Sequence, residues 1–467
     1  MEKQLPKNWI ETEFKNITSF VIGGDWGKDT SVIDDDFIEV LCIRGSEIKN
    51  WTKNKGNTAS LRKIKRSSLT NRSLKFGDIL LEISGGGPDQ PVGRTVFIDN
   101  EVLNFESHIE KVCTNFLRLV RIYENINSEY VNHFLQYFYS TGEITKYQGG
   151  SNNLRNLKYK EYEQIYLPLP PLAEQNRIVA KLDTLFAQLE TIKTSMANIP
   201  LLLKDFRQQV LTQAVTGKLT EEWRKGKKLR EWSNCMLLDV IVEKPRNGYS
   251  PKSVEYETSL KSLALSATTS GKFNAAYVKY LDIEAPKKDS HLWLKNGDIL
   301  IQRSNSLDYV GTPAIYDGKD FDFIYPDIMM KIKSNDSILN NFLMYVLSSQ
   351  KTRKYYRDNA SGTAGNMPKI NQEIVSKTPI ILPSIKEQQE IVNRVESLFG
   401  KANSIEEQYK TLKQKMDTLP QALLHKAFKG ELTEQLDSDG DARELLKEIQ
   451  ELKDQTGVKK KLTKQVI

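Results

Sequence analysis

The pattern of apolar positions along the chain predicts two long helices in coiled-coil register. In two separate stretches, apolar positions alternate spacings of three and four residues, the pattern at the contact face of a coiled coil. The first set is Leu182, Leu185, Leu189, Ile192, Met196, Ile199, Leu203, Phe206 and Val210. The second set is Val395, Leu398, Ala402, Ile405, Tyr409, Leu412, Met416, Leu419 and Leu423, each 213 positions after its counterpart. We therefore expect two helices whose apolar seams pair with each other.

Proline and glycine mark the ends of both stretches. A proline pair at 170–171 precedes the first and Pro383 precedes the second, at positions where a helix tolerates proline. Gly217 and Gly430 follow them as C-terminal caps. About 44 helical residues at roughly 1.5 Å each would form a rod on the order of 65 Å long.

Each stretch also contains an internal proline, Pro200 in the first and Pro420 in the second, at non-equivalent places. Proline inside a helix removes a hydrogen bond and clashes with the preceding turn, so we expect a kink or a break at both. Two separate helices, each packed on its own domain, are the alternative to a pair. That alternative leaves the matched seams unexplained.

The seams belong to a longer internal repeat. The segment Leu169–Val179, which contains Leu-Pro-Pro-Leu-Ala-Glu-Gln, returns as Leu382–Val392, and Gly217–Thr220 returns as Gly430–Thr433. Repeats at short, regular periods indicate solenoids or arrays. Two widely separated copies indicate instead a duplicated unit, in which one globular domain is followed by one long helix.

The globular parts are predicted to be mixed α and β with short strands. Asp78–Ile83 and Asp298–Gln302 are β-rich runs bounded by turn residues, and each follows a similar Leu-Lys-x-Gly segment. Trp9 and Trp232 open the two copies. The expected boundaries are 1–168 and 223–381 for the domains, 169–222 and 382–434 for the helices, and 435–467 for a C-terminal segment. We expect that segment to be a capped helix with a basic, solvated tail, with docking as the alternative.

Bulk composition is that of a folded protein with several domains. At 467 residues the chain is too long for one hydrophobic core, and 39% hydrophobic with 27% charged residues is typical of folded, soluble proteins. No apolar run reaches the roughly 18 residues that span a bilayer. The first residues contain no apolar signal segment, and three cysteines fit a reducing compartment. We therefore expect a cytoplasmic protein.

Basic residues cluster in two places. Between Arg44 and Lys75 there are ten basic residues and one acid, Glu47, and residues 351–357 hold four more beside two tyrosines. Clustered cations with aromatic neighbours suit contact with nucleic-acid phosphates. The net charge of +7 is modest for this length, so a solvated basic surface is an equal alternative for either cluster.

The catalytic signatures that we sought are absent from the sequence. There is no Gly-x-x-x-x-Gly-Lys-[Ser/Thr] phosphate loop, no Gly-x-Gly-x-x-Gly turn and no Asn-Pro-Pro-aromatic tetrapeptide of the amino-methyltransferases. Neither Pro-Asp pair continues into a nuclease motif, and the four histidines show no metal-ligand spacing. We therefore expect no metal site, no cofactor and no catalysis in this chain. An enzyme with an unrecognised active site is the alternative.

These segments together resemble the specificity subunits of type I restriction-modification enzymes. The resemblance lies in Leu169–Val179, in the heptads of the helices and in the segment Gly217–Arg224 that closes the first helix. The two Gly-Asp-Ile-Leu segments and the second ending, 419–432, belong to it as well. It covers essentially the whole chain.

The resemblance implies an α+β fold with two similar mixed α/β target recognition domains, each followed by a long helix. The two helices would pair as an antiparallel coiled coil with pseudo-twofold symmetry. It also implies a non-catalytic subunit whose domains each bind one half of a bipartite, asymmetric double-stranded DNA target, while the helices set the spacer. Two modification (M) subunits with S-adenosylmethionine would methylate adenine, and two restriction (R) subunits would use ATP and Mg. A coiled-coil interaction scaffold without sequence-specific DNA binding is the alternative.

Candidate DNA contacts follow from side-chain chemistry. Arg, Asn and Gln can bind base edges in the major groove, whereas Lys and Arg near glycines mostly bind phosphate. The candidates in the first domain are Lys28, Arg44, Ser84, Arg94, Asn152, Asn153 and Arg155. The candidates in the second domain are Arg246, Asn247, Tyr249, Lys252, Arg303, Asn305, Asn366 and Lys369.

Overall fold

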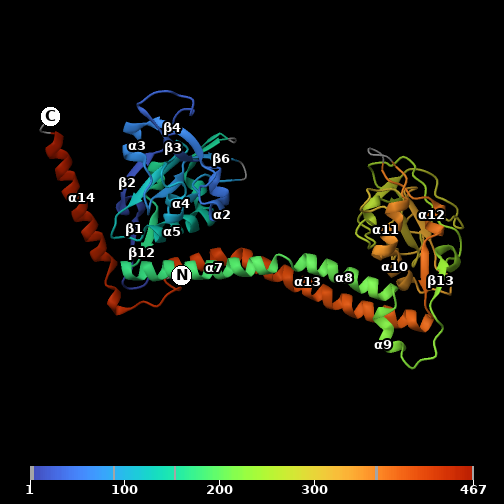
Figure 1. The fold of residues 1–467 in the computed structure, drawn as a ribbon. Helices are drawn as coiled ribbons and strands as arrows, with labels where there is room; N and C mark the ends of the chain where they lie inside the picture. The colour runs from blue at the N-terminus through green and yellow to red at the C-terminus, as the bar shows by residue number, and fades with distance from the viewer. Residues whose placement is uncertain (1–4, 88–89, 152–153, 363–366, 465–467) are drawn as a thin grey trace. The chain divides into compact units, whose positions relative to one another are not determined.

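The computed structural model describes residues 5–87, 90–151, 154–362 and 367–464. The chain divides into two compact units, of which unit 1 comprises 1–195 with 412–467 and unit 2 comprises 196–411. Each unit contains one globular domain and parts of both long helical stretches (Figure 1). The boundary between the units therefore crosses both stretches near their middles, at places where the sequence showed no change of composition.

The first domain is built on two small sheets. One is antiparallel in the order β2-β9-β5-β7, and the other places β3 between antiparallel β4 and parallel β8. Two further pairings, β10-β11-β6 and β1-β12, complete it. The strands are β1 (Ile10–Glu13), β2 (Thr18–Gly23), β3 (Phe37–Ile43), β4 (Ser60–Lys65), β5 (Ile79–Glu82), β6 (Ser84–Gly86), β7 (Thr95–Phe97), β8 (Glu110–Cys113), β9 (Leu117–Ile122), β10 (Gln148–Ser151), β11 (Leu154–Leu157) and β12 (Tyr166–Leu169). The helices are α1 (Phe14–Ile17), α2 (Trp51–Asn54), α3 (Arg66–Arg72), α4 (Asn100–Asn104), α5 (Ser128–Ser140) and α6 (Tyr159–Tyr162).

The second domain repeats this plan with fewer strands. Its main sheet has the order β14-β19-β17-β18, and β15-β16 and β13-β20 form separate pairs. The strands are β13 (Ser233–Met236), β14 (Arg246–Asn247), β15 (Leu260–Leu263), β16 (Val278–Leu281), β17 (Ile299–Gln302), β18 (Pro313–Ile315), β19 (Met329–Ile332) and β20 (Pro379–Leu382). The helices are α10 (Asn340–Ser348), α11 (Gln350–Asn359) and α12 (Gln372–Ser376). The two predicted Gly-Asp-Ile-Leu strands are confirmed as β5 and β17.

Corresponding residues build the two cores. Ile79, Val92 and Ile178 are buried in the core of unit 1, and Ile299, Val310 and Ile391 take the same places in unit 2. In unit 1, β5 shares its buried cluster with α5 and the start of the first long helical stretch. In unit 2, β17 shares its buried cluster with α10 and the start of the second stretch. Burial of equivalent positions explains why these residues persist in both copies while exposed positions differ.

The first long stretch consists of two helices and the second of one. α7 (Leu172–Met196) ends just before α8 (Ile199–Val215), and Pro200 stands in the first turn of α8, where its missing N–H costs nothing. α13 (Ile385–Phe428) continues through Pro420. The break expected as one possibility at Pro420 is therefore absent. The turns after Pro420 are held by buried Leu424 and Phe428, which offsets the loss of one backbone hydrogen bond.

The long helices run antiparallel within each unit. In unit 2, Arg207 of α8 donates to Asn403 and Glu406 of α13, while Thr220 beyond α8 bonds to Glu387 near the start of α13. Residue numbers therefore rise along α13 as they fall along α8. In unit 1, the start of α7 shares a buried cluster with the end of α13, and the two helices lie side by side (Figure 1).

Burial varies along the expected seam. Seven of its members are buried, namely Leu182, Leu189, Leu203, Val210, Val395, Ala402 and Met416. Five others are exposed by more than a third, namely Ile192, Phe206, Ile405, Leu412 and Leu419. The remaining positions, Leu185, Met196, Ile199, Leu398, Tyr409 and Leu423, are half-buried. The apolar seam is thus partly exposed to solvent along its length, because a single partner helix covers only part of a large side chain.

The C-terminal helix packs on unit 1. In α14 (Ala442–Lys464), Ala442, Leu445 and Ile449 are buried, the last two within the core cluster of that unit. The Ala442 backbone N–H donates to Asn8 O at 3.1 Å, and Lys453 Nζ donates to Asn16 O at 2.8 Å. The expectation of a merely solvated end is therefore wrong for the first half of this helix. In the described part of the chain, no helix combines the length and apolar character needed to cross a bilayer.

Candidate nucleic-acid interface

In unit 1, the glutamate of the repeated Glu-Gln motif joins distant segments through its buried carboxylate. Glu174, in the first turn of α7, accepts a hydrogen bond from Trp9 Nε1 at 2.8 Å. Its other oxygen accepts from Thr433 Oγ1 at 3.2 Å and from Gln435 Nε2 at 2.9 Å. All three donors are neutral. The carboxylate therefore joins the beginning of the domain, the start of α7 and the segment after α13.

Glu387 does the same in unit 2 with a different set of donors. It accepts from Trp232 Nε1 at 3.0 Å, from Thr220 Oγ1 at 2.7 Å and from Arg224 Nη2 at 2.6 Å. Here a cation replaces one neutral donor. In both units the threonine belongs to the Gly-x-Leu-Thr ending of the other helical stretch. The repeated endings are therefore structural contacts that join the two helices.

The glutamine of each motif anchors the start of the helix. Gln175 accepts from the backbone N–H of Asn127 at 2.9 Å and donates to Pro170 O at 2.8 Å. Gln388 accepts from the N–H of Leu339 at 2.7 Å and donates to Pro383 O at 3.0 Å. In each copy the partner N–H precedes a domain helix, α5 or α10. The motif thus holds that helix against the long one.

The Gly-Asp-Ile-Leu segments are structural turns. Gly77 and Gly297 have φ values of 88° and 87°, in the left-handed region that favours glycine. Asp78 accepts from the N–H of Lys75 at 2.7 Å and forms an ion pair with Arg121 at 2.7 Å. Burial raises the pKa of Asp78, and the hydrogen bond from Arg121 opposes that shift. The repeated segments therefore position the strands β5 and β17.

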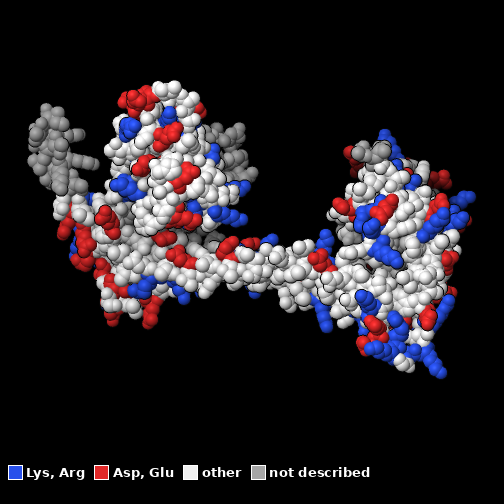
Figure 2. Space-filling model, viewed as in Figure 1, with Lys and Arg blue, Asp and Glu red and all other residues white. Residues whose placement is uncertain are grey.

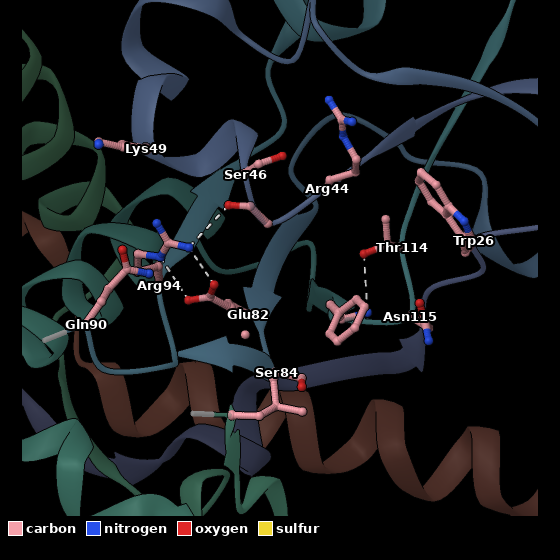
Figure 3. A pocket seen from close by; sticks show the side chains of 14 residues that line it. Trp26, Arg44, Ser46, Lys49, Glu82, Ser84, Gln90, Arg94, Thr114 and Asn115 are labelled. Atoms are coloured by element: carbon pink, nitrogen blue, oxygen red, sulfur yellow. Dashed lines mark hydrogen bonds and ion pairs between the residues drawn. The ribbon is translucent and has the colours of Figure 1, made fainter. Parts of the chain in front are cut away.

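A cavity in the first domain brings three of the predicted contact residues together. It has a volume of about 780 Å³ and lies where β3 and β5 end and β6 begins (Figure 3). Arg44, Ser84 and Arg94 line it. The residues that sequence reasoning missed are Trp26, Gly45, Ser46, Lys49, Glu82, Gly85, Gln90, Thr114, Asn115, Phe116 and Leu154. These come from six separate segments, so no local motif could have predicted the set.

Buried acids orient both arginines of this cavity. Arg94 donates from Nε and Nη2 to the two oxygens of Glu82, at 2.9 and 2.5 Å, and also to Gly45 O at 3.2 Å (Figure 3). The hydrogen bond to Glu82 raises the pKa of Arg94. Arg44 forms a similar pair with Glu47 at 2.5 Å. Lys49 is exposed at the rim and forms no ion pair within the described residues, so its charge is available to an anionic ligand.

The other candidates of the first domain lie outside this cavity or outside the described residues. Lys28 is exposed and its ammonium lies 4.7 Å from the centre of the Phe37 ring. Arg155, on β11, is paired in register with Gly86 of β6 and is half-buried. Asn152 and Asn153 fall in a gap of the described chain. The structure therefore places Arg155 next to a strand that borders the cavity, and Lys28 on another surface.

Candidates of the second domain gather around the end of β17. Arg303 donates to Asp327 O at 3.2 Å, and the backbone of Ser304 is bridged to Lys369. Asn305 donates to Gln302 Oε1 at 2.7 Å. Asn366 lies outside the described residues. Buried Gln302 at the end of β17 corresponds to buried Glu82 at the end of β5. Each domain therefore has a buried polar side chain at the end of this strand, next to the candidate contact residues.

The remaining candidates lie along and after β14. Arg246 is exposed and pairs with Glu243 at 3.0 Å, while Tyr249 and Lys252 are exposed. Asn247 is half-buried, and its side-chain oxygen has no hydrogen-bond partner within the described ranges. A hydrogen bond from Ser250 Oγ to Asp327, at 2.5 Å, links this segment to the candidates at the end of β17, since Arg303 donates to the Asp327 carbonyl.

The basic cluster between Arg44 and Lys75 is largely engaged within the domain. Arg62 donates to Trp26 O at 3.2 Å, Lys63 to Val32 O at 2.8 Å and Arg72 to Gly23 O at 2.8 Å. Lys55 pairs with Asp99. On the face shown in Figure 2, acidic and basic side chains are interspersed over the first domain. The cluster is therefore not one continuous cationic surface.

The second cluster behaves in the same way. Arg353 donates to Val310 O at 2.7 Å and to Asp308 O at 2.9 Å, and burial lowers its pKa to about 10. Tyr356 is part of the core. Lys351 and Arg357 are exposed. Only the exposed residues of this cluster can therefore contact a DNA phosphate.

Comparison with known proteins decides the family. Residues 47–201 and 239–414 both match the family described as the type I restriction modification DNA specificity domain. The chain belongs to this family. The two matched regions confirm the duplication inferred from the repeat.

Characterised relatives match over nearly the full length. The chain is 31% identical over 438 residues to the type I restriction enzyme EcoKI specificity subunit of Escherichia coli (strain K12), covering 92% of this chain and 91% of the relative. It is also 31% identical over 439 residues to the StySPI specificity subunit of Salmonella potsdam, with the same coverage.

Solved structures share the fold of this family member. The crystal structure of the HsdS subunit from Thermoanaerobacter tengcongensis matches with a TM-score of 0.60 at 18% identity, covering 92% of this chain and 99% of that one. A structure from a study of complex assembly and conformational transition of the type I R-M system matches with a TM-score of 0.62, also at 18% identity and with the same coverage.

Proposed function

We propose that this chain is the DNA-sequence-specificity subunit of a type I restriction-modification system. The observation that carries the proposal is the presence of two copies of the DNA specificity domain, each joined to one long helical stretch. Each domain binds one half of a bipartite, asymmetric target. The two domains share their cores and differ in their exposed residues, as two modules with different target sequences should.

In the first domain, the cavity is the proposed base-contacting site. Arg44 and Arg94 are held in place by Glu47 and Glu82, which lowers the entropy lost when a guanidinium binds a base edge. Lys49 at the rim suits a phosphate. In the second domain the corresponding surface is the β17 end with Arg303, Asn305 and Lys369.

The long helices and the partners complete the proposal. The helical stretches determine the spacer between the half-sites. The chain brings two M subunits to the DNA, and these carry S-adenosylmethionine for adenine methylation, whereas two R subunits with ATP and Mg add restriction. The chain itself contributes recognition without catalysis, and the assembly works in the cytoplasm. An interaction scaffold without sequence-specific DNA binding is the alternative.

A gel-shift titration of the chain with its M subunit tests this proposal. We expect one duplex sequence to bind more tightly than random duplexes and the affinity to fall with salt. Lys49→Ala should weaken binding to all duplexes and reduce the salt slope by about one. Lys53→Ala, a neighbouring exposed lysine outside the cavity, is the matched control. Binding with neither sequence preference nor salt dependence would favour the scaffold.

A further inference from the structure

A polar cluster lies in unit 1 where α5 meets α7, apart from the cavity. Glu129 and His133 are one helical turn apart on α5, and Asp183 is on α7. One oxygen or nitrogen atom from each of the three side chains lies within 4.8 Å of the other two. His133 Nε2 and Asp183 Oδ1 are 4.0 Å apart, which is too long for a hydrogen bond.

His133 is buried with its hydrogen-bonding capacity unused. Only 10% of its side-chain surface is exposed, and neither ring nitrogen has a hydrogen-bond partner within the described residues. The Gln136 side chain is nearby, but no hydrogen bond of good geometry joins it to His133. Burying a polar atom without a partner costs about 1–3 kcal/mol, so native proteins rarely do it without a reason.

The cluster is also short of positive charge. The ligand atoms of Glu129 and Asp183 lie within 4.8 Å of each other, so two carboxylates stand together here. The cation that acts on both carboxylates is Lys55, whose ammonium is already paired with Asp99. An added cation would therefore be attracted to the two carboxylates and would use the free nitrogen of His133.

We propose that Glu129, His133 and Asp183 bind a divalent first-row transition-metal ion of the Zn²⁺ type. An imidazole with two carboxylates is a donor set that such ions accept, whereas Mg²⁺ and Ca²⁺ prefer oxygen ligands alone. Zn–N and Zn–O bonds of about 2.0–2.2 Å place ligand atoms about 3–3.5 Å apart, so the side chains must close by on the order of 1 Å. Asp183 is exposed and free to make that adjustment.

The bound ion has a structural consequence. It ties a helix of the first recognition domain to the long helix that follows that domain, through ligands on both. In the Gln175 contact this junction is held by a neutral donor, the backbone N–H of Asn127. The ion would fix the junction further and would make its stability depend on metal.

Metal binding to the full-length, untagged chain tests the proposal. After dialysis against a chelator, we expect one Zn²⁺ to bind per chain in calorimetry and to raise the melting temperature, whereas Mg²⁺ does neither. Asp183→Asn changes an exposed side chain, so it should fold normally and lose at least about 10-fold in Zn²⁺ affinity, the lower end of what even outer-shell changes cost. His133→Ala should lose binding altogether.

Two controls separate this site from surface binding. Glu190→Gln removes an exposed carboxylate from the same helix, and His108→Ala removes an exposed histidine of the same domain. Both should bind Zn²⁺ as the unchanged chain does. Equal binding by the Asp183→Asn chain, or an equal loss in either control, would overturn the proposal. Absence of Zn²⁺ binding to the unchanged chain would overturn it as well, without affecting the proposed DNA function.

Discussion

At the scale of single residues, a buried glutamate joins distant segments within each unit. Glu174 and Glu387 each join three segments that are distant in the chain, with a tryptophan and a threonine in matching roles. In the sequence, both glutamates belong to the repeated segment, and the repeat indicated a shared structural role. Their partners could not be predicted, because the threonine that meets each glutamate belongs to the opposite copy of the repeat.

Thr220→Val should loosen the junction in unit 2 alone. It removes a hydrogen bond to a buried carboxylate, which is worth about 1.5–3 kcal/mol. Hydrogen exchange at the start of α13 should accelerate by roughly 10-fold or more, since about 1.4 kcal/mol is a factor of ten. Peptides around Glu174 serve as the internal reference. Thr216→Val, which changes an exposed threonine bonded only within its own helix end, is the control. Unchanged exchange near Glu387 would show that the bond does not hold the junction.

The cluster of Glu129, His133 and Asp183 shows the limit of sequence reasoning at this scale. Sequence analysis predicted no metal site because the histidines are far from one another. Glu129 and His133 have the spacing of one helical turn, but that spacing is common on any helix. Asp183 joins them only through packing of α7 on the domain. The burial of His133 and its unused nitrogens become visible only in three dimensions.

At the scale of elements, most of the correct predictions came from the apolar periodicity and from the prolines and glycines at helix and strand ends. The two seams, Gly217, Gly430 and the Gly-Asp turns lead directly to α7, α8, α13, β5 and β17, because each depends on local geometry. Pro420 does not break α13, and buried Leu424 and Phe428 hold the turns that follow it. The cavity was only partly predicted: Arg44, Ser84 and Arg94 were identified by chemistry, while Trp26 and Asn115 reach it through the fold.

The docking of α14 gives a prediction at this scale. Ile449→Ala removes a side chain that is 2% exposed, which costs about 2–5 kcal/mol in a core. That cost falls on one helix held by few buried residues, so we expect α14 to detach locally and a protease to cleave after residue 440 more rapidly. Glu451→Ala, on the exposed side of α14, should leave cleavage unchanged. Equal resistance of both variants would mean that other contacts hold the helix.

At the scale of the whole molecule, duplication explains the organisation. Each unit holds one domain against parts of both helical stretches, and each repeated ending meets the opposite copy. The chain has two specificity domains, and in the proposed function each binds one half of a target. Helix length then becomes the variable that determines the distance between the half-sites, which is the central claim of the proposed function.

Inserting one heptad into both stretches, after Leu189 and after Ala402, tests that claim most directly. A heptad preserves the seam register and lengthens each stretch by roughly 10 Å, about three base pairs of axial rise. The longer spacing also rotates the second half-site, which reduces the gain by about one or two base pairs. Sequencing the methylated motif made by the assembled variant is the measurement. We predict unchanged half-site sequences separated by a longer unspecified spacer; an active enzyme with an unaltered spacer would contradict the account.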